Sequence, residues 1–211
     1  ELKTPLQGII GSAELIENGM VKPEDMPRFI GHIRTEAQRL VALIADIIRL
    51  SQLDEGVEMP KENVELLSLA GEVAEDLRAA ADKASVTITT DGQSSIVFGV
   101  RRLLYEMLYN LCDNAIKYNR PGGSIRIHVE NREQEAAISV LDTGIGIAPE
   151  HQSLIFERFY RVDKSHSKAS GGTGLGLSIV KHAAMYHGGK VALESEPGRG
   201  TEIRVTLPKE R

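Results

Sequence analysis

The chain has 211 residues, 41% hydrophobic and 26% charged, so it is long enough for one large domain or two ordinary ones. Its net charge of -5 argues against general nucleic-acid binding, which requires a basic surface. The single cysteine, Cys112, cannot form an internal disulfide and favours a reducing compartment. No apolar run approaches the roughly 18 residues that cross a bilayer, and no segment has the pattern of a signal peptide.

Two N-terminal segments have apolar residues at alternating steps of four and three, which is typical of amphipathic helices. The residues that follow this spacing are Leu2, Leu6, Ile9, Ala13 and Ile16 in the first segment and Ile30, Ile33, Ala37, Leu40, Ile44 and Ile47 in the second. Asn18-Gly19 and Pro23 predict a short turn between the segments. The sequence therefore predicts an antiparallel hairpin of two long helices. The first helical pattern is already under way at Glu1, which indicates a piece of a longer protein.

The apolar stripes of this hairpin are too wide to be buried between two helices alone. A second copy of the chain would bury them in a dimeric four-helix bundle, which is the arrangement we expect. The alternative is a hairpin that packs on its own C-terminal domain.

Gly56 and Pro60 mark a linker at 56–61, which separates the hairpin (1–55) from a second domain (62–211). In this domain we expect helices at 67–83, 101–118 and near 152–159, and a glycine-opened helix that ends at His187. Strands are predicted near Val64 and at 86–89, 95–98, 124–130, 136–141, 191–195 and 202–207. The order does not alternate strand and helix, so the expected fold class is α+β, with an α/β sandwich that carries its helices on one face.

A glycine-rich stretch at 171–177 (GGTGLGL) runs directly into an apolar helical pattern. The start of a helix presents unpaired N–H groups and a partial positive charge, which together suit a phosphate. The alternative is a simple loop before an amphipathic helix. The region from 142 to 173 has little regular pattern, and an irregular connection of this length indicates a lid or binding loop, at about 148–173.

Two further groups of residues have the chemistry of a nucleotide site. Asp142 precedes Gly144 and Gly146, so a strand-end carboxylate could accept a hydrogen bond from the exocyclic amine of adenine while the glycines admit the flat base. Asn110 and Asn114 lie four residues apart on one helical face, where amide oxygens and phosphates could hold Mg²⁺. The alternatives are a surface turn for the first group and solvated polar positions for the second.

In chain order the three motifs are N-x-x-x-N, D-x-G-x-G and G-x-G-x-G. Together they resemble the motifs of sensor histidine kinases, which belong to the GHKL ATPase superfamily with the Bergerat nucleotide-binding fold. The segments that resemble the boxes of this family are 110–118 (N box), 142–146 (G1), 156–161 (F), 172–177 (G2) and 198–201 (a final glycine turn). Residues 1–6 (ELKTPL) resemble the H box without its histidine. Residues 159–164 are most similar to the lids of phosphate-sensing and cell-wall-sensing kinases.

The resemblance implies a role for each matching residue. Asp142 would bind the adenine amine, and Asn110 and Asn114 would lie at Mg²⁺ and the phosphates of ATP. Glu1 would be the acid/base, Thr4 would position water for dephosphorylation, and Arg161 would contact the phosphates and take part in catalysis. The remaining ATP-binding residues would be Lys117, Tyr118, Gly144, Gly146, Ile147, Tyr160, Gly172, Thr173, Gly174, Leu175, Gly176, Leu177 and Thr201.

The phosphoacceptor histidine of the family would directly precede Glu1, and none of the six histidines in the chain has an equivalent position. The resemblance also implies a homodimer through the hairpin, a response-regulator receiver domain as partner, no nucleic acid, and a cytoplasmic location as part of a membrane-anchored sensor. The alternatives are a GHKL ATPase that hydrolyses ATP, a serine-kinase regulator of the anti-sigma type, and a nucleotide-dependent scaffold or mainly phosphatase sensor. The relatives that hydrolyse ATP place a glutamate where Asn110 stands.

Overall fold

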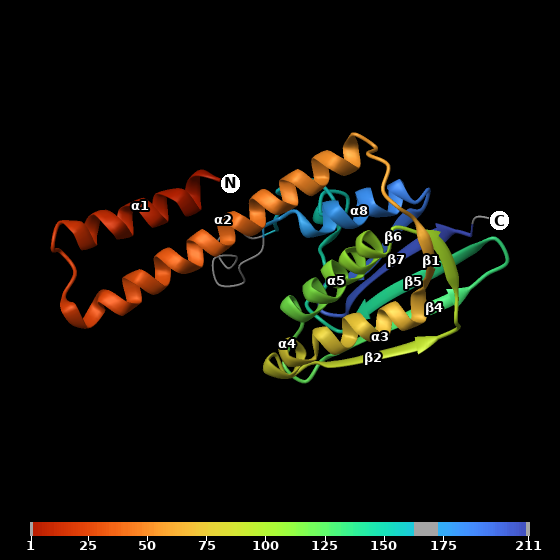
Figure 1. Cartoon of the computed structure of the whole chain (residues 1–211). Helices are drawn as coiled ribbons and strands as arrows, with labels where there is room; N and C mark the ends of the chain where they lie inside the picture. Colours follow the sequence, from red (N-terminus) through yellow and green to blue (C-terminus); the bar gives the residue numbers. More distant parts are fainter. Residues whose placement is uncertain (1, 163–172, 210–211) are drawn as a thin grey trace.

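The computed structural model describes residues 2–162 and 173–209. A long helical hairpin stands beside an α/β domain, and the second helix of the hairpin leads into that domain (Figure 1). The elements in chain order are α1 (Lys3–Glu17), η1 (Pro23–Asp25), α2 (Met26–Asp54), β1 (Glu62–Glu65), α3 (Leu66–Asp76), α4 (Arg78–Lys83), β2 (Thr87–Gly92), β3 (Ile96–Gly99), α5 (Arg101–Lys117), β4 (Ser124–Asn131), β5 (Glu135–Asp142), α6 (Pro149–Gln152), α8 (Gly176–Tyr186), β6 (Lys190–Glu196) and β7 (Gly200–Pro208).

Five strands form one mixed sheet in the order β2-β4-β5-β7-β6, and β1 pairs with β3 in a separate two-stranded ribbon. Within the large sheet, β2 and β4 are parallel while the other neighbours are antiparallel. The β5–β7 pairing places Asp142 directly opposite Thr201. This register brings the G1 segment next to the final glycine turn, although the two are about sixty residues apart in the chain.

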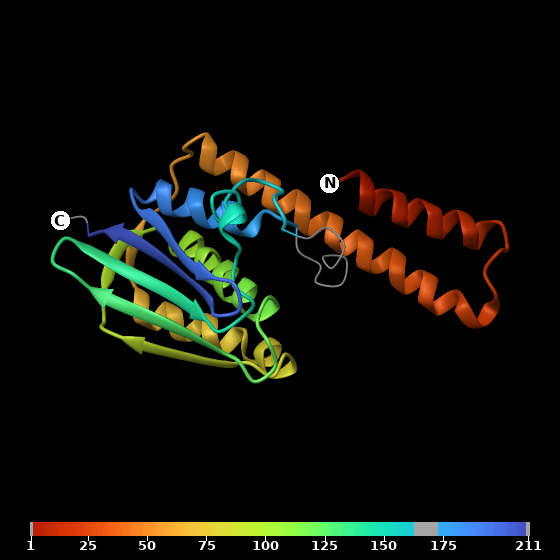
Figure 2. The ribbon, with the colours of Figure 1, turned by 180° about the vertical axis from the view of Figure 1, so that it is seen from behind.

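Helices α3, α5 and α8 cover one face of the sheet, and the opposite face is open (Figures 1 and 2). The core between the layers consists of aliphatic side chains, and Leu104 of α5, Ile127 of β4 and Val205 of β7 are completely buried. The alternation of buried and exposed positions along β4 and β7 is the pattern of strands with one covered face. The expected α+β class, a helical region followed by an α/β sandwich, is confirmed.

The two helices of the hairpin meet through small and polar residues. Pro5 and Ser12 are the buried residues of α1, and the Ser12 hydroxyl lies 3.1 Å from Nδ1 of His32 on α2. Gly8 faces the same histidine ring, which would lie 3.4 Å from a β-carbon at that position. The apolar residues Leu2 and Leu6 remain exposed, so the predicted stripe is not buried within one chain.

The C-terminal half of α2 packs against the α/β domain. Leu43 and Leu50 form an apolar cluster with Leu175 and Ile179 at the start of α8. At the end of α2, Leu53 joins the main core of the domain. The alternative expectation, a hairpin that packs on its own C-terminal domain, therefore describes this half of α2.

Two predicted helices differ from the observed ones. The expected helix at 67–83 is divided at Leu77 into α3 and α4. The expected helix near 152–159 is instead the short α6, Pro149–Gln152, followed by turns, because Pro149 starts the helix three residues earlier. None of the helices in the described residues has the length and apolar character that a membrane span requires.

Candidate functional site

The carboxylate of Asp142 lies at the end of β5 and organises the G1 segment. It accepts a hydrogen bond of 2.7 Å from the N–H of Gly144. Burial raises the pKa of Asp142, while the N–H groups of Gly144 and Thr201 act in the opposite direction. A half-buried carboxylate held in this way can still accept a further hydrogen bond, as the predicted adenine contact requires.

The two glycines of the G1 segment are required by the surrounding protein backbone. A β-carbon at Gly144 would lie 2.3 Å from the carbonyl oxygen of Tyr118, and one at Gly146 would lie 2.0 Å from that of Glu196. Gly146 also has a φ of +67°, which L-residues rarely adopt. The loop is therefore packed between the end of α5 and the β6–β7 turn. Close packing is therefore a second reason for glycine at these two positions, beside the access of a flat base that the sequence suggested.

Asn110 and the start of α8 come together, although they belong to motifs more than sixty residues apart. The amide nitrogen of Asn110 donates a 2.9 Å hydrogen bond to the carbonyl of Glu106. Its amide oxygen consequently faces Gly176, where a β-carbon would lie only 2.9 Å away. Asn114 follows one turn later on α5 and is half-buried. The side chain of Leu175, the N-cap residue of α8, makes no capping hydrogen bond, and the helix dipole favours an anion at this end.

The F segment packs against the glycine-rich stretch. The N–H of Phe159 donates a 2.9 Å hydrogen bond to the carbonyl of Gly174. Gly174 has a φ of +75°, and a β-carbon there would lie 3.4 Å from Cγ of Arg161. Tyr160 is held by its hydroxyl, 2.7 Å from Nδ1 of His151. The structure therefore places the stem of Arg161 beside Gly174, two residues before α8.

The end of α5 adds one cation and one aromatic side chain. Lys117 forms an ion pair of 2.6 Å with Asp113, four residues earlier on the same helix. Tyr118 is exposed, and its carbonyl accepts the N–H of Ile145 at 3.1 Å. Both residues thus stand at the edge of the G1 segment. Their side chains are accessible to a ligand without rearrangement of the core.

Several predicted site residues lie elsewhere or contribute only backbone groups. Thr4 is exposed on α1, in the hairpin. The hydroxyl of Thr173 donates a 2.9 Å hydrogen bond to Asp46 of α2. The side chain of Leu175 is buried against α2, and that of Leu177 packs on the main core. Glu1 and Gly172 lie outside the described residues, as does the part of the predicted lid at 163–172.

Two residues that the sequence did not identify brace the site from β6 and α6. Ser195 accepts the N–H of Ile147 at 2.9 Å and contacts the hydroxyl of Thr201 at the same distance. The side-chain amide of Gln152 donates to the carbonyls of Ile147 and Ser195, both at 2.9 Å. Two of these contacts, Ser195 with Ile147 and Gln152 with Ser195, join segments 48 and 43 residues apart. No local sequence pattern would have indicated them.

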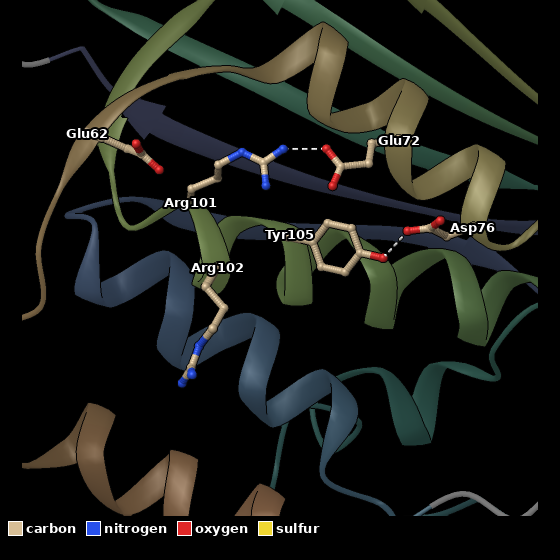
Figure 3. Close-up of a pocket in the computed structure, with 6 residues that line it drawn as sticks. All are labelled: Glu62, Glu72, Asp76, Arg101, Arg102 and Tyr105. Atoms are coloured by element: carbon tan, nitrogen blue, oxygen red, sulfur yellow. Dashed lines mark hydrogen bonds and ion pairs between the residues drawn. The ribbon is translucent and has the colours of Figure 1, made fainter.

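An open groove of about 510 Å³ lies away from these residues, between α3 and the start of α5 (Figure 3). Four of its lining side chains form two pairs with each other. Arg101 pairs with Glu72, and the hydroxyl of Tyr105 donates a 2.6 Å hydrogen bond to Asp76, which raises the pKa of Tyr105 to about 12. None of the predicted site residues lines this groove.

No group of three or more His, Cys, Asp or Glu side chains suitable for a metal ion occurs in the part of the chain that the structure describes. A metal bound at the site would therefore depend on neutral oxygen ligands and on the phosphates of a nucleotide. The amide oxygen of Asn110, which faces the start of α8, fits that requirement.

The geometry agrees with comparisons to known families. The model of the family described as "Histidine kinase-, DNA gyrase B-, and HSP90-like ATPase" matches residues 99–211, more than half of the chain. The chain therefore belongs to this ATPase family. A second model, "His Kinase A (phospho-acceptor) domain", matches residues 1–56, which include both helices of the hairpin.

Individual relatives point to one branch of the family. The sensor-like histidine kinase SenX3 of Mycolicibacterium smegmatis is 38% identical over 211 residues, which are 99% of this chain and 55% of SenX3. The chain thus spans little more than half the length of that relative. The histidine kinase AdeS of Acinetobacter baumannii has the same fold, with a TM-score of 0.83 over 100% of this chain and 98% of AdeS at 24% identity. The histidine kinase ThkA, solved in complex with the response regulator protein TrrA, gives 0.77 at 25% identity over 100% of this chain and 59% of that chain.

Proposed function

We propose that this chain is the kinase core of a two-component sensor histidine kinase. It binds Mg-ATP in the α/β domain, and the γ-phosphate of ATP is transferred to a histidine expected directly before Glu1. The phosphoryl group then passes to an aspartate of a response regulator. The observation that carries this proposal is the combination, in one chain, of a phospho-acceptor hairpin with a site that has an amide rather than a carboxylate at Asn110.

Each part of the nucleotide has a partner in this proposal. Asp142 accepts the adenine amine, and the loop of Gly144 and Gly146 forms the wall beside the base. The N–H groups at the start of α8 and the guanidinium of Arg161 bind the phosphates. Lys117 and Tyr118 reach the phosphate chain from the end of α5, and Thr201 supports Asp142 from β7.

Mg²⁺ would be held by the amide oxygens of Asn110 and Asn114 together with the phosphates. A hard divalent cation prefers such oxygen ligands, and it supplies charge neutralisation while the phosphoryl group is transferred. The protein contributes the orientation of the Asn110 amide, because its nitrogen is already engaged with the carbonyl of Glu106.

Direct hydrolysis of ATP is the main alternative, and the geometry argues against it. A hydrolytic relative needs a carboxylate that activates water near the γ-phosphate. The carboxylate one turn before Asn110 is Glu106, and it faces Arg49 of α2 at 3.0 Å. The Glu106 carboxylate is therefore paired with a cation of the hairpin and is not available to activate water beside the nucleotide.

The hairpin supports the proposed partners. Its exposed apolar residues, among them Leu6 and Ile30, give a second copy a surface to cover. We therefore propose a homodimer. We also propose a response-regulator receiver domain as partner, because ThkA was solved in complex with the response regulator protein TrrA. Thr4 would position the water that dephosphorylates this partner, and Glu1 would take the imidazole proton.

The test uses a longer chain in which the residues before Glu1 are restored. With Mg²⁺ and ATP labelled in the γ-phosphate, we expect a phosphate on the protein that is labile in acid and stable in base. Replacement of the restored histidine by alanine should remove the label. A label that persists in this variant, or fast release of inorganic phosphate without labelling, would contradict the proposal and favour the hydrolytic alternative.

A further inference from the structure

The hydroxyl of Tyr186, the last residue of α8, makes two hydrogen bonds to the linker between the domains. It donates to the carbonyl of Val57 at 3.0 Å and accepts the N–H of Met59, also at 3.0 Å. A hydroxyl can donate and accept at the same time, so one atom satisfies two backbone groups two residues apart. The ring of Tyr186 and the side chain of Met59 also pack on the main core.

Little else holds this segment. The N–H groups of Gly56 and Val57 bond back to the end of α2, to the carbonyls of Leu53 and Gln52. Between Val57 and the start of β1 at Glu62, the hydrogen bonds that the described residues make to the α/β domain are the two at Tyr186. Most of this linker is exposed. Apart from the packing of Met59 on the core, its path over the domain therefore depends on the hydroxyl of one side chain.

The contact at Tyr186 continues a series along two neighbouring helices. Leu43 and Leu50 of α2 pack with the start of α8, and Asp54 at the end of α2 lies 3.2 Å from His182, one turn before Tyr186. The two helices run side by side in the same direction (Figure 1), and the linker extends their contact by one more step. If the two helices separated, water could replace the contacts of Leu43, Leu50 and Asp54. The linker would still be held to the α/β domain by the hydroxyl of Tyr186.

We propose that Tyr186 is a positioning residue that clamps the interdomain linker and so sets the orientation of the α/β domain against α2. The clamp acts from the last residue of the helix whose first residues form the proposed phosphate site. It does not touch that site, so the clamp does not depend on the proposed function. Loss of the hydroxyl should free the linker while the nucleotide site and the fold remain intact.

The test compares Tyr186→Phe with Tyr105→Phe in the whole chain. Both changes remove only a hydroxyl, and Tyr105 bonds to Asp76 of α3 rather than to the linker. Hydrogen exchange of the Met59 amide, followed by NMR, should become about tenfold faster in Tyr186→Phe, because its acceptor is lost. The amides of β5 should be unchanged. The Tyr105→Phe control should resemble the wild type at both places.

A second measurement reports the orientation itself. Spin labels at Arg34→Cys on α2 and Glu133→Cys in the β4–β5 turn, diluted with unlabelled protein, give distances within one chain, and Cys112 is buried. We expect a narrow distribution in the wild type and the control, and a broader one in Tyr186→Phe, with equal affinity for ATP. Unchanged exchange at Met59 or an unchanged distribution would overturn the clamp. Faster exchange throughout β5 would also overturn it, because the hydroxyl would then support the fold rather than the linker.

Discussion

The two halves of α2 have the same apolar spacing and different surroundings. Before Leu43, Ile30 is 55% exposed and Val41, just past the midpoint of the helix, is 69% exposed. In the C-terminal half, Leu43 and Leu50 are 4% and 2% exposed, because the start of α8 covers them. A heptad pattern therefore predicts that a helix face will be buried. It does not predict whether another part of the same chain or a second copy buries it.

This contrast separates two kinds of contact that can be broken independently. The docked half holds the α/β domain in place by apolar packing and a few buried charges. The free half presents its apolar face to a second copy, as we propose. Variants in one half should change the arrangement of the domains, and variants in the other half should change the number of chains.

The largest effect is expected from charge in the free half. Ile30→Asp with Val41→Asp places two carboxylates on the proposed dimer surface, where their burial is very unfavourable. Sedimentation equilibrium should then change from about twice the chain mass to 23.1 kDa. The distance between α2 and the α/β domain should not change. A variant that remains dimeric would show that the second copy binds a different face.

The next effect is expected from a cavity in the docked half. Leu50→Ala removes a buried side chain and should weaken the docking of α2 by about 2–5 kcal/mol. Mass-spectrometric hydrogen exchange over residues 43–54 should report the loss as faster exchange. Ile48→Ala, at a 54% exposed position two residues away, is the matched control and should cost less than about 0.5 kcal/mol. Equal effects of the two changes would show that this half is not docked in solution.

A smaller effect is expected from the charge pair between α2 and α5. Nε of Arg49 and Oε2 of Glu106 are buried 3.0 Å apart, but their geometry does not form a hydrogen bond. Arg49→Met removes the nearer cation of the Glu106 carboxylate and leaves it the more distant Arg102, at 3.7 Å, so the docking should weaken by about 1–3 kcal/mol. The double variant with Glu106→Gln should recover most of this loss in the same exchange experiment. No recovery would mean that Arg49 acts through other contacts.

The smallest effect is expected from pH. Burial raises the pKa of Asp46, against the hydrogen bond from Thr173 and the charge of Arg49, and burial also raises the pKa of Glu106. Both carboxyl groups therefore bind protons more readily in the docked arrangement than in water. Docking should accordingly tighten as pH falls from 7 towards 5, and this gain is lost again as pH rises through the raised pKa values.

This pH dependence can be measured from the spin-label distances in a His182→Gln background, which removes the imidazole beside Asp54. The hydrogen bond from Arg158 lowers the pKa of Asp54, so that carboxyl stays ionised in both arrangements over this range. Asp46→Asn should flatten the profile. A pH profile of docking that is flat in the His182→Gln protein with Asp46 intact would contradict the role of Asp46. A profile that is steeper after Asp46→Asn would contradict it as well.

The sequence predicted those elements whose patterns are local. The β4–β5 hairpin follows from alternation around a turn, and the helical hairpin follows from a three–four spacing with Pro23 in its turn. The motifs also predicted a nucleotide site, which stays a prediction; in the structure Asn110 faces Gly176, and Asp142 accepts the N–H of Gly144.

The rest depends on contacts between distant segments, which no local pattern records. The parallel pairing of β2 with β4 joins strands separated by the whole of α5. Ser195 braces Ile147 across 48 residues, and Tyr186 reaches the linker across 127 and 129 residues. A serine in an alternating strand and a tyrosine at a helix end are both ordinary in sequence. Their roles arise only from the fold that surrounds them.

The most direct test of the nucleotide site compares the binding of ATP and inosine triphosphate by calorimetry, because the inosine base lacks the exocyclic amine. Wild-type protein should prefer ATP, and Asp142→Asn should reduce the affinity for ATP about tenfold or more and abolish that preference. Asp91→Asn is the control, since this carboxylate pairs with Arg126 on the open face of the sheet. An Asp142→Asn variant that keeps the wild-type affinity and preference would contradict the assignment of Asp142 as the adenine-binding residue.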